Sequence, residues 1–130
     1  MLNLRKVHHI AIICSDYERS KKFYTEVLGL SPIAEHFRSG RNSFKLDLAL
    51  NDQYVIELFS FPDPPHRLSG PEARGLRHLA FETTDLDLDI SFLKGKAIAV
   101  EPVRVDEHTG KRFTFFHDPD RLPIELYENK

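Results

Sequence analysis

Two histidines and two glutamates stand at matching positions in the two halves of the chain. His9 is followed 48 residues later by Glu57, and His78 is followed 47 residues later by Glu125. Each lies in a short apolar run of the same kind, so residue type, flanking pattern and spacing all recur. Imidazole nitrogens together with carboxylate oxygens suit a divalent transition metal that keeps coordination positions for water or substrate. The four residues therefore form a candidate metal site.

Each of these residues also has an ordinary structural interpretation. A single histidine in such a run is usually a satisfied core or edge residue, and a single glutamate is usually half exposed. A carboxylate between Ile and Leu, however, is costly to bury without a partner. Two glutamates of this kind, each matched by a histidine, favour a shared cation over coincidence.

The two halves share one order of predicted elements, which is a strand, a helix and then three strands. Each candidate ligand falls in a predicted strand, and these strands cover 9–13, 55–59, 77–81 and 123–127. A helix follows each histidine strand, over 17–28 after the N-cap pair Ser15-Asp16, and over 86–97 after Thr84-Asp85. We predict one α+β domain over 1–130, with module 1 at 5–60, a proline-rich linker at 61–75 and module 2 at 76–129.

Strand alternation assigns the candidate ligands to one face of each sheet. Glu57 shares a face with Val55 and Phe59, opposite Ile56 and Leu58. In all four strands the apolar neighbours fit beneath a helix, and the His or Glu side chain faces away from it. Two curved mixed sheets of this kind would line a cavity with two histidines and two glutamates.

Composition excludes several classes of function. The 130 residues carry a formal net charge of −2, without the basic excess that nucleic-acid binding demands. No stretch approaches the roughly 20 apolar residues of a membrane span. The single cysteine, Cys14, rules out a disulfide within the chain and fits a reducing cytoplasm. We therefore expect a cytoplasmic protein that binds neither nucleic acid nor membrane.

The sequence resembles the vicinal oxygen chelate (VOC) superfamily, also called the glyoxalase/bleomycin resistance/dioxygenase superfamily. The resemblance covers nearly the whole chain and is carried by V-H-H-I-A-I, by D-Y-E-R-S-K-K-F-Y-T-E-V-L-G-L, by V-I-E-L-F, by L-R-H-L-A-F and by D-P-D-R-L-P-I-E-L-Y-E. The Y-V-I-E-L-F-S-F-P and K-R-F-T-F-F stretches look closest to the YaeR-type glyoxalase-like branch. This resemblance implies the VOC fold, with two tandem βαβββ modules around a metal-binding cavity.

The four-ligand set is similar to that of bacterial glyoxalase I, a metal-dependent lyase. The resemblance implies that His9, Glu57, His78 and Glu125 are the metal ligands, and that Glu125 is the catalytic base with Glu57 across the metal. It implies an isomerase or lyase acting on a small substrate with vicinal oxygens through an enediolate. Nickel or cobalt is favoured, with zinc, manganese or iron as alternatives. It further implies a homodimer in which each site draws ligands from both chains.

Three departures from glyoxalase I leave the substrate open. Ile13 and Phe61 stand where an arginine and an asparagine commonly hold glutathione, which argues against that thiol. Arg121 occupies the usual glycine position of the D-P-D-G turn, which predicts an uncommon backbone conformation there.

Among the basic residues, Arg112 is the preferred candidate for attracting an anionic substrate. Three alternatives to a glyoxalase-type isomerase or lyase remain open. The protein could catalyse thiol transfer, catalyse an Fe(II) dioxygenase step, or sequester a ligand without turnover.

Overall fold

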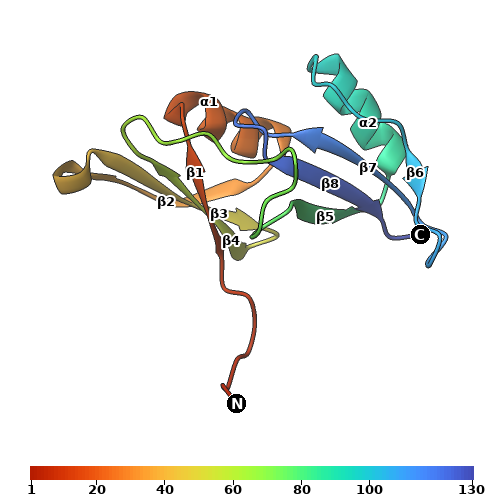
Figure 1. The fold of residues 1–130 in the computed structure, drawn as a ribbon, viewed down its shortest axis with the longest axis horizontal. Helices are drawn as coiled ribbons and strands as arrows, with labels where there is room; N and C mark the ends of the chain where they lie inside the picture. The colour runs from red at the N-terminus through yellow and green to blue at the C-terminus, as the bar shows by residue number, and fades with distance from the viewer. The chain divides into compact units, whose positions relative to one another are not determined.

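Both halves of the chain build a four-stranded mixed sheet with a helix on one face, in the predicted element order (Figure 1). The computed structural model describes residues 1–130, which divide into the units Met1–Pro65 and His66–Lys130. The boundary between the units falls inside the stretch predicted as a linker. The strands form two separate four-stranded sheets, so the predicted α+β class with two βαβββ modules is confirmed.

The first module places its first and last strands side by side and parallel. The sheet order is β1-β4-β3-β2, and the other neighbours are antiparallel. The elements are β1 (Ile10–Cys14), α1 (Tyr17–Lys22) continued by π-helical turns (Phe23–Val27), β2 (Ser31–Arg38), a 3₁₀ turn (Ser39–Arg41), β3 (Ser43–Leu50) and β4 (Gln53–Ser60).

The second module repeats this arrangement with shorter outer parts. Its sheet order is β5-β8-β7-β6, with β5 parallel to β8 and the remaining neighbours antiparallel. The elements are β5 (Leu79–Thr83), α2 (Leu86–Gly95), β6 (Arg104–Val105), β7 (Arg112–His117) and β8 (Pro123–Glu128). The element that most differs from its counterpart is β6, which is two residues long where β2 has eight.

The helices begin where the sequence predicts. The Asp16 side chain accepts a hydrogen bond from the Arg19 backbone N–H at 3.1 Å, and Asp85 accepts one from Leu88 at 3.0 Å, so both aspartates are N-caps. The first helix extends as far as predicted, but its second half is π-helical. The second helix ends at Gly95, so Ala97, predicted on its apolar face, lies beyond it with φ 58°. No helix of the protein is long and apolar enough to cross a bilayer.

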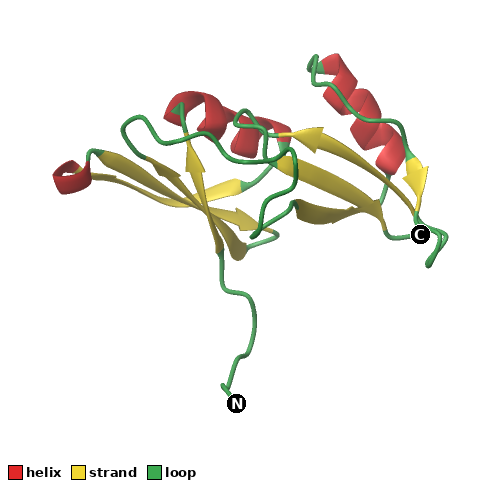
Figure 2. Cartoon of the chain, viewed as in Figure 1, coloured by secondary structure: helices red, strands yellow, loops and turns green.

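Each sheet buries one face beneath its helix and leaves the other face more open (Figure 2). Along β4, Ile56 and Leu58 are almost fully buried while Glu57 is not, as alternation predicts. The same alternation holds along β8, where Ile124 and Leu126 are buried around Glu125. The buried face of each sheet forms the core of its module, and it includes Ile12, Cys14, Leu46 and Leu48 in the first and Leu79 and Phe116 in the second.

The turn before β8 confirms the uncommon conformation predicted for Arg121. Arg121 has φ 68°, in the left-handed region that side chains with a Cβ rarely adopt. The turn is held by the buried Asp118, whose carboxylate accepts from the backbone N–H groups of Asp120 at 2.9 Å and Leu122 at 2.8 Å. The hydrogen bonds of Asp118 therefore hold Arg121 in a conformation that glycine would adopt without strain.

Replacing Arg121 with glycine should stabilise the protein. The left-handed conformation costs an L-residue about 1–2 kcal/mol, and glycine removes this cost. Glycine also makes the unfolded chain more flexible, which destabilises the folded state by about 0.5–1 kcal/mol and offsets part of the gain. We expect Arg121→Gly to raise the free energy of unfolding by about 0.5–1 kcal/mol, measured by urea denaturation. Arg121→Ala, which loses the same side chain but keeps a Cβ, should give no gain. Equal stability of the two variants would contradict this account.

Candidate functional site

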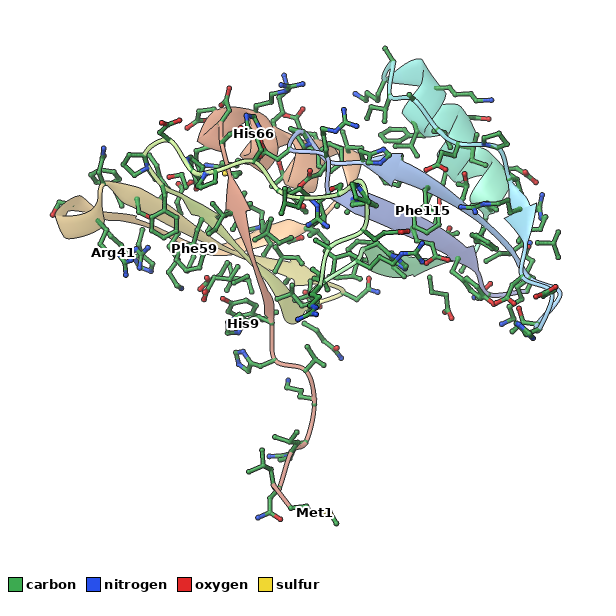
Figure 3. The ribbon with its side chains drawn as sticks, in the orientation of Figure 1. Met1, His9, Arg41, Phe59, His66 and Phe115 are labelled. Carbon is green, nitrogen blue, oxygen red and sulfur yellow. The ribbon has the colours of Figure 1, made fainter.

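His9 and Glu57 form a pair on the open face of the first sheet. His9 directly precedes β1, and Ala11, two residues later, is in register with Glu57 on β4. His9 Nε2 lies 3.7 Å from Glu57 Oε2, and their side chains are 35% and 14% exposed. Figure 3 shows His9 and Phe59 on the side of this sheet away from α1. The first predicted pair is therefore brought together within its own module.

His78 and Glu125 occupy the equivalent positions in the second module. His78 directly precedes β5, and Ala80, two residues later, is in register with Glu125 on β8. His78 Nε2 lies 2.9 Å from Glu125 Oε2, with the two side chains 26% and 13% exposed. The repeat found in the sequence is thus a repeat of strand register. Both histidines were predicted to lie inside strands, but the observed strands β1 and β5 begin one residue after them.

The chemistry of each pair fits half of the predicted metal site. An imidazole nitrogen and a carboxylate oxygen, both half-buried and facing each other, are donors that divalent transition metals take. In neither module does a third His, Cys, Asp or Glu side chain join the pair in a group able to hold a metal ion. Each module by itself therefore offers two donors of the four.

The carboxylate of Glu57 is held by two further side chains from the first sheet. Lys45 Nζ, on β3, lies 3.4 Å from Glu57 Oε2 and 2.8 Å from Asp47 Oδ1. The Tyr54 hydroxyl lies 2.8 Å from Glu57 Oε2 and 2.8 Å from Asp47 Oδ1. Its ring also lies against His9, with the centroids 5.1 Å apart. Together with Glu57, these side chains form a polar cluster beside His9. We call this cluster the Glu57 clamp (Lys45, Asp47, Tyr54 and Glu57).

Charge and burial shift the titration of the clamp residues in the directions that the contacts require. The hydrogen bond to Asp47 raises the pKa of Lys45. Burial alone would raise the pKa of Asp47, but the hydrogen bonds from Lys45 and Tyr54 outweigh it and lower that pKa. Burial, reinforced by the two neighbouring carboxylates, raises the pKa of Tyr54 well above its usual range. The clamp is therefore charged at Lys45 and Asp47 and neutral at Tyr54 near neutral pH.

Sequence reasoning missed Tyr54 because a β-bulge reverses its direction. Ile56 pairs with Leu48, yet the next residue of β3, Ala49, pairs with Tyr54, so Val55 is an extra residue in β4. Strict alternation placed Val55 on the Glu57 face and would turn Tyr54 toward the helix. The bulge instead brings the Tyr54 hydroxyl to Glu57. No alternating pattern along β4 could have indicated this.

Glu125 lacks such a clamp, because aromatic residues replace the charged ones. On β7, Phe115 is in register with Glu125, where β3 places Asp47 opposite Glu57. The Phe115 ring stands edge-on to His78, with the centroids 5.1 Å apart. His78 is the one side chain within ion-pair or hydrogen-bond distance of the Glu125 carboxylate. The two glutamates therefore share a position in the fold but differ in how firmly they are held.

Arg112 is not a site for anionic ligands, which corrects the preference drawn from the sequence. Its guanidinium contacts Glu128 Oε1 at 2.7 Å and both carboxylate oxygens of Asp87 at 3.1 Å. These hydrogen bonds lower the pKa of Glu128 and of Asp87. Arg112 thus ties β7 to β8 and to the start of α2. Its charge is already neutralised by two carboxylates within the module.

Comparison with known proteins identifies the family. The model of the Glyoxalase/Bleomycin resistance protein/Dioxygenase superfamily matches residues 6–126. The chain belongs to this superfamily. The VOC assignment suggested by the motifs is therefore confirmed, and with it the assignment of the two-module fold.

Similar proteins of this superfamily align over almost the full chain. The uncharacterized protein YwkD of Bacillus subtilis (strain 168) is 62% identical over 96% of this chain and 98% of its own length. The uncharacterized protein YaeR of Escherichia coli (strain K12) is 59% identical over 98% and 99%. The crystal structure of a glyoxalase family protein from Enterococcus faecalis superposes with a TM-score of 0.89 at 46% identity, covering 98% of this chain and all of that one.

Superfamily members named for an activity are more distant. A mitochondrial methylmalonyl-CoA epimerase of Bos taurus is 28% identical over 91% of this chain and 70% of its own length. A lactoylglutathione lyase of Schizosaccharomyces pombe is 27% identical over 93% of this chain and 46% of its own length. The superfamily of this chain therefore includes epimerases and lyases.

Removing Lys45 should weaken the fold in a pH-dependent way. Lys45→Met leaves Asp47 and Glu57 without their cation, and we expect a loss of about 1 kcal/mol at pH 7. The Asp47 pKa is lowered in the folded state, so this contribution is present above the unfolded-state value near 3.9 and fades as pH falls below it. Urea denaturation at pH 7 and below pH 4 measures both. The exposed Lys94→Met is the control, and an equal loss at both pH values would contradict this prediction.

Proposed function

We propose that this protein is a metal-dependent isomerase or lyase of the glyoxalase I type, acting on a small substrate with vicinal oxygens. The observation that carries the proposal is the His–Glu pair repeated at the same register position on the open face of both sheets. His9, Glu57, His78 and Glu125 would hold the ion, with nickel or cobalt favoured. Epimerases and lyases among the distant relatives support the class of reaction.

The chemistry divides between the ion and the two glutamates. A divalent ion held by these residues would stabilise the negative charge left on two adjacent substrate oxygens when the neighbouring carbon loses its proton. Glu125 would take that proton and return it to the adjacent carbon, which leaves the substrate isomerised and the carboxylate regenerated. Every other step requires only that the substrate be positioned and water excluded.

The structure favours Glu125 over Glu57 as the base because their surroundings differ. A base must leave its resting contact and reach the substrate. The carboxylate of Glu125 meets only His78, whereas Glu57 is held by Lys45 and Tyr54. Movement of Glu57 would break its ion pair with Lys45 and its hydrogen bond from Tyr54. Glu57 is therefore suited to stay in place and Glu125 to move a proton.

Two positions that hold glutathione in glyoxalase I carry apolar side chains in this protein. Ile13, which stands where an arginine would grip that tripeptide, is 54% exposed and is in register with Phe59 on β4. Phe61, which stands in place of the asparagine, stacks beside Phe59 with the ring centroids 5.9 Å apart. Losing the arginine contact alone would lower affinity roughly 10- to 100-fold. We therefore expect a substrate smaller than a glutathione adduct.

Replacing Glu125 with glutamine separates metal binding from proton transfer. Glutamine keeps one oxygen donor but cannot accept the proton. In the nickel-loaded protein we expect kcat on the true substrate to fall by roughly 10²- to 10⁴-fold, with metal retained at lower affinity. Glu57→Gln, assayed at saturating metal, should lower kcat less, and the exposed Glu107→Gln should leave it unchanged. Near-normal turnover of Glu125→Gln, or saturable binding without turnover in the wild type, would refute the assignment.

Because each module offers two ligands, the proposal requires a first module and a second module to meet. From the resemblance to glyoxalase I, we expect the two modules of one site to come from different chains of a homodimer. Neither His9→Ala nor His78→Ala chains should then bind metal tightly alone. After subunit exchange, a mixture should regain one intact site per heterodimer, measured as tight nickel binding and as activity. Tight binding that never returns on mixing, or a protein that is monomeric at micromolar concentration, would contradict the shared-site dimer.

A further inference from the structure

The second module contains a pocket of about 290 Å³ next to His78. One wall is the segment 67–77, and the floor belongs to the open face of the sheet, including Phe115, His117 and Pro123. Arg67 fixes the segment through hydrogen bonds to the Ser69 hydroxyl at 2.5 Å and to the Leu76 carbonyl at 3.2 Å. The volume lies at the lower end of the range for small-molecule sites, so the pocket fits a small metabolite rather than a tripeptide adduct.

Three arginines line this pocket, and Arg104 is the one whose N–H groups make no hydrogen bond within the protein. Its guanidinium carbon lies 5.0 Å from the centroid of the Phe113 ring and 5.4 Å from that of Phe115. The closest carboxylate, that of Glu101, is 4.0 Å away, beyond hydrogen-bond distance. The aromatic rings hold Arg104 without using its N–H donors. These donors are therefore available to a ligand.

Arg77 supplies a second positive charge to the pocket, and its ion pair with Glu72 is weak. Arg77 contacts Glu72 at 2.7 Å, but the two side chains are 70% and 67% exposed. Surface pairs of this kind contribute little, because water competes for both groups. An anion entering the pocket could replace Glu72 at little cost. With three arginines against two glutamates, the lining is positive overall.

A single aromatic ring connects the arginine to the proposed metal ligand. The centroid of the Phe115 ring lies 5.4 Å from the Arg104 guanidinium carbon and 5.1 Å from the centroid of the His78 ring. Arg104 and His78 line the same pocket. A molecule with an anionic group at Arg104 can therefore extend past Phe115 toward His78, whose Nε2 lies 2.9 Å from Glu125 Oε2.

We infer that this pocket binds the anionic tail of the substrate, a carboxylate or a phosphate, through Arg104 with help from Arg77. The inference rests on the proposed function, since it assigns the other end of the substrate, with its vicinal oxygens, to the His78–Glu125 side. The substrate class is then a small 2-hydroxy or 2-oxo compound that ends in a second anionic group. Guanidinium groups suit both carboxylate and phosphate.

Matched ligands test this assignment. 2-Hydroxyglutarate and 2-hydroxypentanoate share the chelating end and differ in the charge of the tail, and 3-phosphoglycerate and glycerate form the phosphate pair. We expect the member with the charged tail to bind roughly 10- to 100-fold more tightly. Isothermal titration calorimetry on the nickel-loaded and on the metal-free protein gives the affinity, and backbone NMR of the metal-free protein gives the location. The largest shifts with the charged tail should fall at Arg77, Arg104 and Phe115.

Variants at two arginines test whether Arg104 causes the preference for a charged tail. Arg104→Gln should abolish the preference for the charged tail and leave the affinity for 2-hydroxypentanoate unchanged, whereas Arg19→Gln, an exposed arginine of α1, should change neither. Equal affinity for the two tails, or a loss with Arg19→Gln as large as with Arg104→Gln, would overturn the inference. Failure of the proposed function is distinguishable, because it would appear as ligand affinities that nickel does not change while the tail preference persists.

Discussion

The parallel ladder between the first and last strands of each module determines where every candidate ligand lies. In both modules the histidine stands two residues before the strand residue that pairs with the glutamate. A shift of this ladder by one residue would turn the glutamate toward the helix and bury an unpaired carboxylate. Core packing and ligand placement therefore depend on the same register. The apolar residues on either side of each glutamate fix it, because only one register buries them.

The two modules use this common scaffold to create different surroundings for the same pair. In the first, Lys45, Asp47 and Tyr54 surround Glu57 with charge and hydrogen bonds. In the second, Phe113 and Phe115 replace the charged residues, and Arg104 packs on their rings. The surroundings of each glutamate are therefore set by the neighbouring antiparallel strand, which is β3 for Glu57 and β7 for Glu125. A repeated fold has produced one carboxylate held by several side chains and one that contacts a single histidine.

Much of this arrangement could be predicted from the sequence. The spacing of His9, Glu57, His78 and Glu125 indicated two equivalent modules, and alternation placed Glu57 and Glu125 on the open faces, as the structure shows. The conformation of Arg121 followed from its place in a turn that usually contains glycine. These features are local, or depend on a period that the sequence displays directly. They could be read without knowing which residues meet in space.

What the sequence did not reveal depends on contacts between distant residues or on an irregular backbone. Arg112 looked free because its partners, Asp87 and Glu128, lie 25 and 16 residues away. The pocket at Arg104 exists only because the segment 67–77 folds beside β7 and β8. Tyr54 was hidden by the bulge at Val55. In a relative whose ladder is regular, the same tyrosine would stand two residues before the glutamate instead of three. An ungapped alignment would then match it to Val55 and record the clamp as lost where it has been kept.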